Sequence, residues 1–115
     1  MRWTQIAERR ADDVVILDLR GHPGDLDLEL RLITKINELL RSGHSGILLN
    51  LRHVMRLDAV GLGTIVRGCA AAREANAVMK LIVSPSLMKT LRTTQLDTAL
   101  EIFELESEAL ESFGN

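Results

Sequence analysis

Hydrophobic residues along the chain follow two patterns, short continuous runs and longer stretches with an apolar residue every three or four positions. Short runs are typical of strands buried in a sheet, and the longer spacing is typical of helices with one buried face. From these patterns we expect strands at residues 4–8, 14–19, 47–51, 78–83 and 99–103. We expect helices within residues 25–42, at about 62–76, from residue 84 onward and at 107–113.

Residues at the expected helix ends support these boundaries. Asp25 can cap the first helix, and Ser42-Gly43 can end it. Ser84-Pro85 is a helix start, because serine caps free amides and proline is tolerated at the first helical position. Asn76 is the expected stop of the helix that begins near Leu62. The buried face of that helix is expected to consist of Leu62, Ile65, Val66, Cys69 and Ala72.

The order of these elements predicts an α/β fold. The first two strands are joined by the polar turn 11–13 and should therefore be antiparallel. The later strands are separated by helices, and such crossovers favour parallel neighbours. We expect a single domain over residues 1–115, with a mixed, mostly parallel central sheet of about five strands and about four helices.

Composition and charge narrow the possible functions. Hydrophobic residues make up 46% of the chain, enough to build a core, so the chain is not disordered. A formal net charge of -2 provides no basic field, and we expect no direct nucleic-acid partner. The apolar runs are far shorter than the roughly 20 residues that cross a bilayer. These features predict a cytoplasmic protein without membrane insertion.

Catalytic and metal-binding patterns are weak in this sequence. His22, His44 and His53 lie far apart, and no pair of ligands has a typical metal-binding spacing, so we expect neither a metal nor a cofactor. No nucleophile stands beside a base in a known motif, which predicts a protein that is not an enzyme. Cys69 is expected to be a small core residue, and the acidic residues 101–111 are expected to be solvated.

One segment, Gly61-Leu62-Gly63-Thr64, has the shape of a phosphate-binding turn at a helix start. A P-loop would require a lysine and a hydroxyl residue after its last glycine, and a dinucleotide-binding turn would have a third glycine where this chain has Val66. We therefore expect the two glycines to allow a tight turn and a close approach of the helix to the sheet. A nucleotide-binding sensor is the least supported alternative.

The segment 58–63, Asp-Ala-Val-Gly-Leu-Gly, follows a buried strand and opens a helix. Together with the strand 47–51, the segment 80–83 and the segment 94–97, it resembles the STAS domains, the family of bacterial anti-sigma-factor antagonists. Their loop reads Asp-Ser-Ser/Ala/Thr-Gly-Leu-Gly at this place. The resemblance extends over almost the whole chain.

This resemblance implies a non-catalytic regulatory protein. Such antagonists dock on an anti-sigma factor, often a serine kinase with a histidine-kinase-like ATPase fold, and thereby release a sigma factor. Phosphorylation of the serine after the loop aspartate ends that binding, because a phosphate adds charge and bulk to the docking loop. A STAS adaptor subunit of an ATPase of the lipid-transport type is the alternative role.

The chain departs from the family pattern at two places. Ala59 occupies the position of the phosphorylated serine, and Val60 has no hydroxyl either, so the usual off-switch is missing. Thr64 is the nearest hydroxyl residue, and we expect it to form a local hydrogen bond. Residues 21–25 also differ from the Gly-x-Leu-Asp turn of the family, which leaves the identity of the partner open.

The expected partner-binding residues follow from the motif and the helix behind it. They are Arg56, Asp58, Ala59, Val60, Gly61, Leu62, Gly63, Thr64 and Arg67. Two roles remain open for Asp58, a cap of the helix amides or a contact to the partner. The oligomeric state is also open, because the first strand could pair between subunits or be kept from pairing by its charged residues.

Overall fold

The computed structural model describes residues 5–20, 26–54 and 57–114, and the cap expected at Asp25 lies outside them. Within these residues the chain forms five strands, four α-helices and one 3-10 turn. In chain order they are β1 (Gln5–Ala11), β2 (Val14–Arg20), α1 (Leu26–Arg41), β3 (Gly46–Leu51), α2 (Ala59–Glu74), β4 (Val78–Val83), α3 (Pro85–Thr93), the 3-10 turn (Leu96–Thr98), β5 (Ile102–Phe103) and α4 (Glu106–Phe113).

The strands form one mixed sheet in the order β1-β2-β3-β4-β5. β1 is antiparallel to β2, and the remaining neighbours are parallel. The predicted fold class is thus confirmed. The hairpin between β1 and β2 pairs Ala11 with Val14 and places Asp12 at a positive φ of 54°, so β1 continues up to the turn instead of ending near residue 8 as expected.

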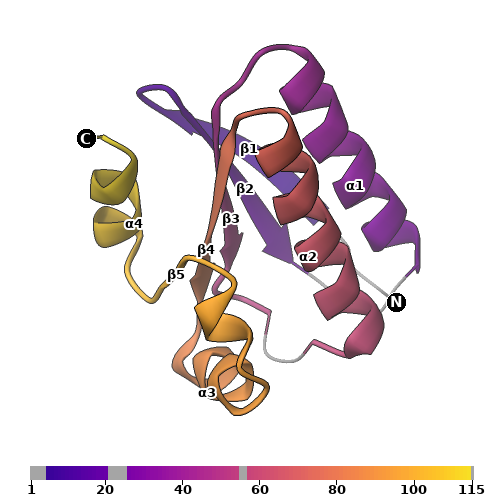
Figure 1. Ribbon diagram of the computed structural model, residues 1–115, viewed down its shortest axis with the longest axis vertical. Helices are drawn as coiled ribbons and strands as arrows, with labels where there is room; N and C mark the ends of the chain where they lie inside the picture. The colour runs from indigo at the N-terminus through magenta and orange to yellow at the C-terminus, as the bar shows by residue number, and fades with distance from the viewer. Residues whose placement is uncertain (1–4, 21–25, 55–56, 115) are drawn as a thin grey trace.

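The two faces of the sheet are covered unequally (Figure 1). The helices α1 and α2 lie side by side on one face, called here the main face, while the short α4 lies on the opposite face, called the α4 face. Alternate residues of each strand point to opposite faces, because the side chains of a strand alternate. On the main face Leu17, Leu49 and Leu81 belong to a large aliphatic cluster, whereas on the α4 face Ile16, Leu48 and Ile82 belong to a small cluster with Ala109.

Most helix ends agree with the sequence-based expectations. Gly43 takes a positive φ of 89°, and the amide of His44 donates to the carbonyl of Leu39, which ends α1 at a glycine as expected. Ser84 Oγ accepts a hydrogen bond from the amide of Leu87 at 3.2 Å and caps α3. Asn76, with a positive φ of 59°, follows Ala75, the C-cap of α2.

Three expectations were wrong in detail. α2 begins at Ala59, not near Leu62, because Asp58 caps the helix three residues earlier. Val66 is 41% exposed and does not belong to the buried face of α2. β5 has two residues instead of the expected 99–103, since residues 99–101 follow the 3-10 turn without strand conformation.

Candidate functional site

The start of α2 is set by the carboxylate of Asp58. Its Oδ1 accepts a hydrogen bond from the amide of Gly61 at 2.8 Å, and its backbone carbonyl accepts one from the amide of Leu62 at 3.0 Å. Asp58 is therefore a helix cap, the first of the two roles that the sequence left open, and the residue is also exposed to solvent. A phosphate bound at this helix start would have to displace a carboxylate that already occupies it.

The motif residues fall on opposite sides of α2 because they lie in its first two turns. Ala59 and Val60 are exposed, and Val60 exposes 54% of its surface. Gly61 is buried, and Leu62 is half-buried against the main aliphatic cluster. Ala59 and Val60 can therefore be reached from solvent, whereas Gly61 and Leu62 support the packing of the helix.

Thr64 points into the protein and is 1% exposed. Its Oγ1 donates to the carbonyl of Val60 at 3.0 Å and accepts from Arg67 Nη2 at 3.3 Å. This is the local hydrogen bonding that the sequence predicted. A buried hydroxyl with both functions in use is not accessible to a kinase.

The two motif glycines do not take the backbone conformation that only glycine favours. Neither Gly61 nor Gly63 has a positive φ, and a Cβ added at Gly63 would meet only Arg67 Nη1, at 3.6 Å. The expected tight turn and close approach at Gly63 are thus wrong, because this residue lies within the helix and faces outward. The close approach of α2 occurs at Gly68, where an added Cβ would lie 3.0 Å from Cδ1 of Ile36.

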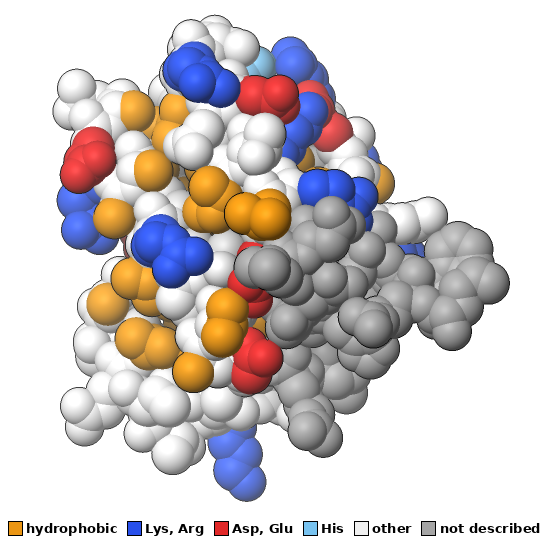
Figure 2. Space-filling view, turned by 90° about the vertical axis from the view of Figure 1, so that its right-hand side faces the viewer, with side chains coloured by type: hydrophobic (Ala, Val, Ile, Leu, Met, Phe, Trp, Pro, Cys, Tyr) orange, Lys and Arg blue, Asp and Glu red, His pale blue; other side chains and the backbone are white. Residues whose placement is uncertain are grey.

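The outward side of α2 carries small and aliphatic residues. Residues 59, 63, 66 and 70 recur at three- and four-residue spacing and so share one side of the helix. Figure 2 faces the side of the molecule on which α1 and α2 lie, and it shows hydrophobic side chains in patches between charged ones. We define the α2 surface as the exposed residues Asp58, Ala59, Val60, Val66 and Arg67. Arg56 lies outside the described residues.

A buried carboxylate that the sequence did not reveal as special lies beneath this surface. Glu29 of α1 is 5% exposed and, with Gly61 and Thr64, lines a small cavity of about 10 Å³. The sequence suggested that Glu29 is one of the carboxylates that cap the start of the first helix. Its place one turn into α1, on the side that faces α2, explains the burial.

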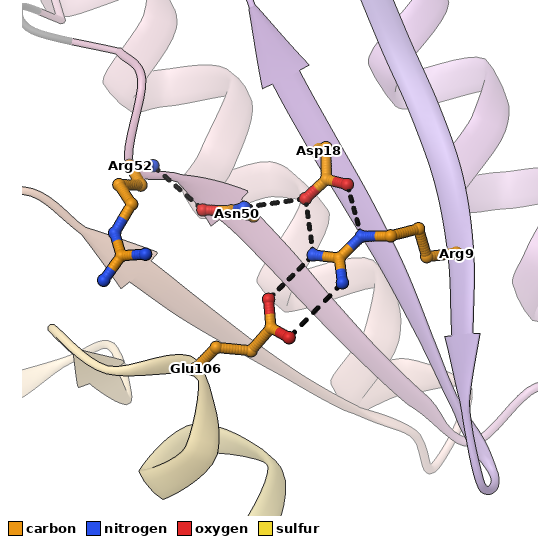
Figure 3. A network of polar contacts seen from close by, with 5 residues as sticks. All are labelled: Arg9, Asp18, Asn50, Arg52 and Glu106. Carbon is orange, nitrogen blue, oxygen red and sulfur yellow. Dashed lines mark hydrogen bonds and ion pairs between the residues drawn. The ribbon is translucent and has the colours of Figure 1, made fainter.

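A network of polar side chains occupies the α4 face at the ends of β2 and β3 (Figure 3). Arg9 of β1 donates through Nε to Asp18 Oδ2 at 2.5 Å and through Nη2 to Glu106 Oε1 at 2.7 Å. Asn50 of β3 donates through Nδ2 to Asp18 Oδ1 at 2.7 Å, and its Oδ1 accepts from the amide of Arg52 at 3.0 Å. The hydrogen bonds from Arg9 hold the pKa of Asp18 below its ordinary value, and the one from Asn50 acts in the same direction against the effect of burial.

Lys80 forms a second polar contact between the α4 face and α4. It is 7% exposed, and its Nζ donates to the carbonyl and to Oγ of Ser112 at 3.1 and 2.8 Å. The same ammonium lies 4.8 Å from the ring centroid of Phe113, within the range of a cation–π contact. The sequence did offer a signal for Asn50 and Lys80, since each is a polar residue inside an otherwise apolar strand.

Metal ligands and reactive thiols do not gather at these places. Among the described residues, no group of three or more His, Cys, Asp or Glu could hold a metal ion. Burial raises the pKa of the Cys69 thiol to about 11, so the thiolate is scarce at neutral pH. In the same part of the chain, no helix combines the length and the apolar character needed to span a bilayer.

Known proteins are similar to this chain in their structures. No protein-family model and no curated protein sequence matches the chain. The fold is similar to that of TM1081 from Thermotoga maritima, a protein proposed to be an anti-sigma factor antagonist, with a TM-score of 0.81 and 24% identity over 96% of this chain and 95% of that one. An anti-sigma factor antagonist from Mycobacterium paratuberculosis gives a TM-score of 0.80 at 18% identity, over 98% and 96% of the two chains.

The Bacillus cell fate determinant SpoIIAA, solved in its phosphorylated form, gives a TM-score of 0.71 at 18% identity and covers 96% of this chain and 99% of its own. The chain therefore has the STAS fold of the anti-sigma factor antagonists, from β1 to α4.

Proposed function

We propose that this chain is a non-catalytic regulator of the anti-sigma-factor-antagonist type. It docks through the α2 surface on an anti-sigma factor that is a serine kinase of the histidine-kinase-like ATPase fold, and thereby releases a sigma factor. The observation that carries this proposal is the exposure of Val60 and Val66 on the helix that opens at Asp58, in a fold shared with antagonists over nearly the whole chain. Exposed aliphatic side chains beside Arg67 provide the mixed apolar and charged chemistry of a docking site.

The regulator is not switched by phosphorylation at the start of α2. Ala59 is exposed at the first position of the helix, where the antagonists have the serine that accepts phosphate, and its methyl group cannot be phosphorylated. The nearby hydroxyl of Thr64 is buried and bonded. The binding-competent state is therefore permanent as far as this segment is concerned.

Calorimetric titration with the kinase-type anti-sigma factor of the same organism tests this proposal. We expect native protein to bind, and Ala59→Asp to bind about tenfold or more weakly, because a second carboxylate beside Asp58 must be desolvated at the contact. Glu108→Gln, a change at an exposed residue of α4, is the control and should bind like the native protein. Equal affinity of native protein and Ala59→Asp would show that the α2 surface is not the interface.

The missing hydroxyl also suits a second role, that of a permanent adaptor subunit of a lipid-transport ATPase, for which no phosphorylation switch is needed. This role predicts that the tagged chain co-purifies with a transporter nucleotide-binding subunit. Recovery of sigma-regulatory proteins without that subunit would exclude it.

A further inference from the structure

Asn50 connects the sheet to the segment that leads into α2. β3 ends at Leu51, and the next backbone amide, that of Arg52, donates to Asn50 Oδ1 at 3.0 Å. Two residues later the amide of Val54 donates to the carbonyl of Leu51 at 2.9 Å, and the Val54 side chain is buried in the main cluster. The start of the segment that carries the chain toward Asp58 is thus fixed by these three contacts.

The orientation of the Asn50 amide follows from its two neighbours. Arg52 offers an N–H donor, so the oxygen of the amide must face it, and Asp18 offers a carboxylate acceptor, so the NH₂ group must face that. Asn50 is 9% exposed, which makes a lost hydrogen bond costly to replace with water. An aspartate or an alanine at this position could not make both contacts.

Asp18 is itself held in place by Arg9. The guanidinium contacts both oxygens of Asp18, at 2.5 and 2.9 Å, and both oxygens of Glu106, at 2.7 and 3.3 Å. Figure 3 shows the resulting series of contacts from Glu106, the first residue of α4, to the backbone of Arg52. Residues 97 positions apart in the sequence are joined in this way.

We propose that Asn50 is a positioning residue for the α2 surface. It fixes the course of the chain where it leaves β3, at the amide of Arg52, and Asp18, Arg9 and Glu106 keep the Asn50 amide in the required orientation. The link to partner binding rests on the proposed function, whereas the positioning of the segment does not.

Hydrogen exchange in the free protein tests the positioning without any partner. In Asn50→Ala we expect the amide of Arg52 to exchange about 5 to 10 times faster than in a control of similar stability, because one hydrogen bond is lost. Ile47→Val is a suitable control, since it removes one methyl group from the other end of β3 and leaves the network intact. Equal exchange of Arg52 in the two variants would overturn the proposal.

Swapping the side chains at positions 18 and 50 provides a second test. Asn50→Asp should increase exchange at Arg52, because it places a carboxylate against Asp18 where the structure has a hydrogen bond of 2.7 Å. The double variant Asp18→Asn/Asn50→Asp again pairs an amide with a carboxylate but loses the contact of residue 18 with Arg9 Nη2, so it should exchange more slowly at Arg52 than Asn50→Asp does without reaching the native rate. Failure of the double variant to improve on Asn50→Asp would contradict a positioning role through Asp18.

Binding kinetics separate this inference from the proposed function. If the kinase-type anti-sigma factor binds the native protein, the Asn50→Ala variant should dissociate from it about 3 to 10 times faster than the Ile47→Val variant does. Fast exchange at Arg52 with unchanged dissociation would overturn the link to docking. Absence of binding by the native protein would refute the proposed function, while the exchange experiment would still decide the positioning of the segment.

Discussion

On the main face of the sheet the strands contribute aliphatic side chains that pack under α1 and α2, whereas on the α4 face they contribute a small aliphatic cluster beside Asp18, Asn50 and Lys80. α4 has eight residues, too few for a helix that is stable by itself. Its attachment therefore depends on polar contacts of defined geometry as well as on burial. The comparison indicates that the main face provides most of the stability, while the α4 face orders particular groups, among them the backbone amide of Arg52 just after β3.

Two adjacent leucines of β3 measure the difference between the faces. Leu49 points to the main face and Leu48 to the α4 face, and both are fully buried. Leu49→Ala should lower the free energy of unfolding by about 4 kcal/mol and Leu48→Ala by about 2 to 3 kcal/mol, because a cavity under a short helix can collapse more easily. Urea denaturation of both variants measures this. A cost at Leu48 equal to or larger than that at Leu49 would show that the two faces contribute alike.

The contact of Lys80 with Ser112 can be broken at its ammonium. Lys80→Met keeps the length of the side chain but removes the donor, and we expect a loss of about 1 to 3 kcal/mol in the free energy of unfolding. Proteolysis within α4 should become faster in the same variant. Lys89→Met, at an exposed position of α3, should change stability by less than about 0.5 kcal/mol. If the two variants were equally stable, Lys80 would not hold α4 on the sheet.

The network around Asp18 predicts a dependence of stability on pH. Arg9 lowers the pKa of Asp18 in the folded state, so the folded protein binds fewer protons than the unfolded chain does near and below pH 4. The stabilisation is therefore fully present above the unfolded pKa of about 4 and is lost as the pH falls through the lowered folded pKa.

Asp18→Asn should remove this part of the dependence. Between pH 7 and pH 3 the native protein should lose about 1 kcal/mol more than the variant in the free energy of unfolding, as measured by denaturation at each pH. The pKa of Glu8 is also lowered, by Lys35, but Glu8 is present in both proteins and does not enter the difference. Parallel pH profiles of the two proteins would mean that the contact of Asp18 with Arg9 adds no stability.

Features set by neighbouring residues in the chain could be predicted from the sequence more reliably than features set by distant ones. Elements with local signals were predicted well, since β4 runs over residues 78–83 as expected and Ser84 caps α3. The start of α2 was misplaced because the motif 58–63 suggested a loop, although Asp58 caps the helix directly. Val66 was assigned to the wrong side for a different reason, since an apolar residue next to the buried residues of a helix fits their spacing almost as well.

The polar network could not be predicted from spacing. Its members lie on β1, β2, β3 and α4, and they meet because the register pairs Asp18 with Asn50 and because α4 returns to the sheet. No local pattern contains that information. The candidate docking residues were recognised as a segment, but the division into exposed Ala59 and Val60 and buried Gly61 and Thr64 required the helix to be placed against the sheet.

Phosphorylation of an Ala59→Ser variant tests the central proposal most directly. Native protein and variant are each incubated with the kinase-type anti-sigma factor and ATP, and phosphate incorporation and the affinity for that partner are then measured. We predict that the native protein takes up no phosphate and binds equally well before and after, whereas the variant is phosphorylated at residue 59 and loses binding. Phosphorylation of the native chain with loss of binding would contradict a permanently competent docking surface.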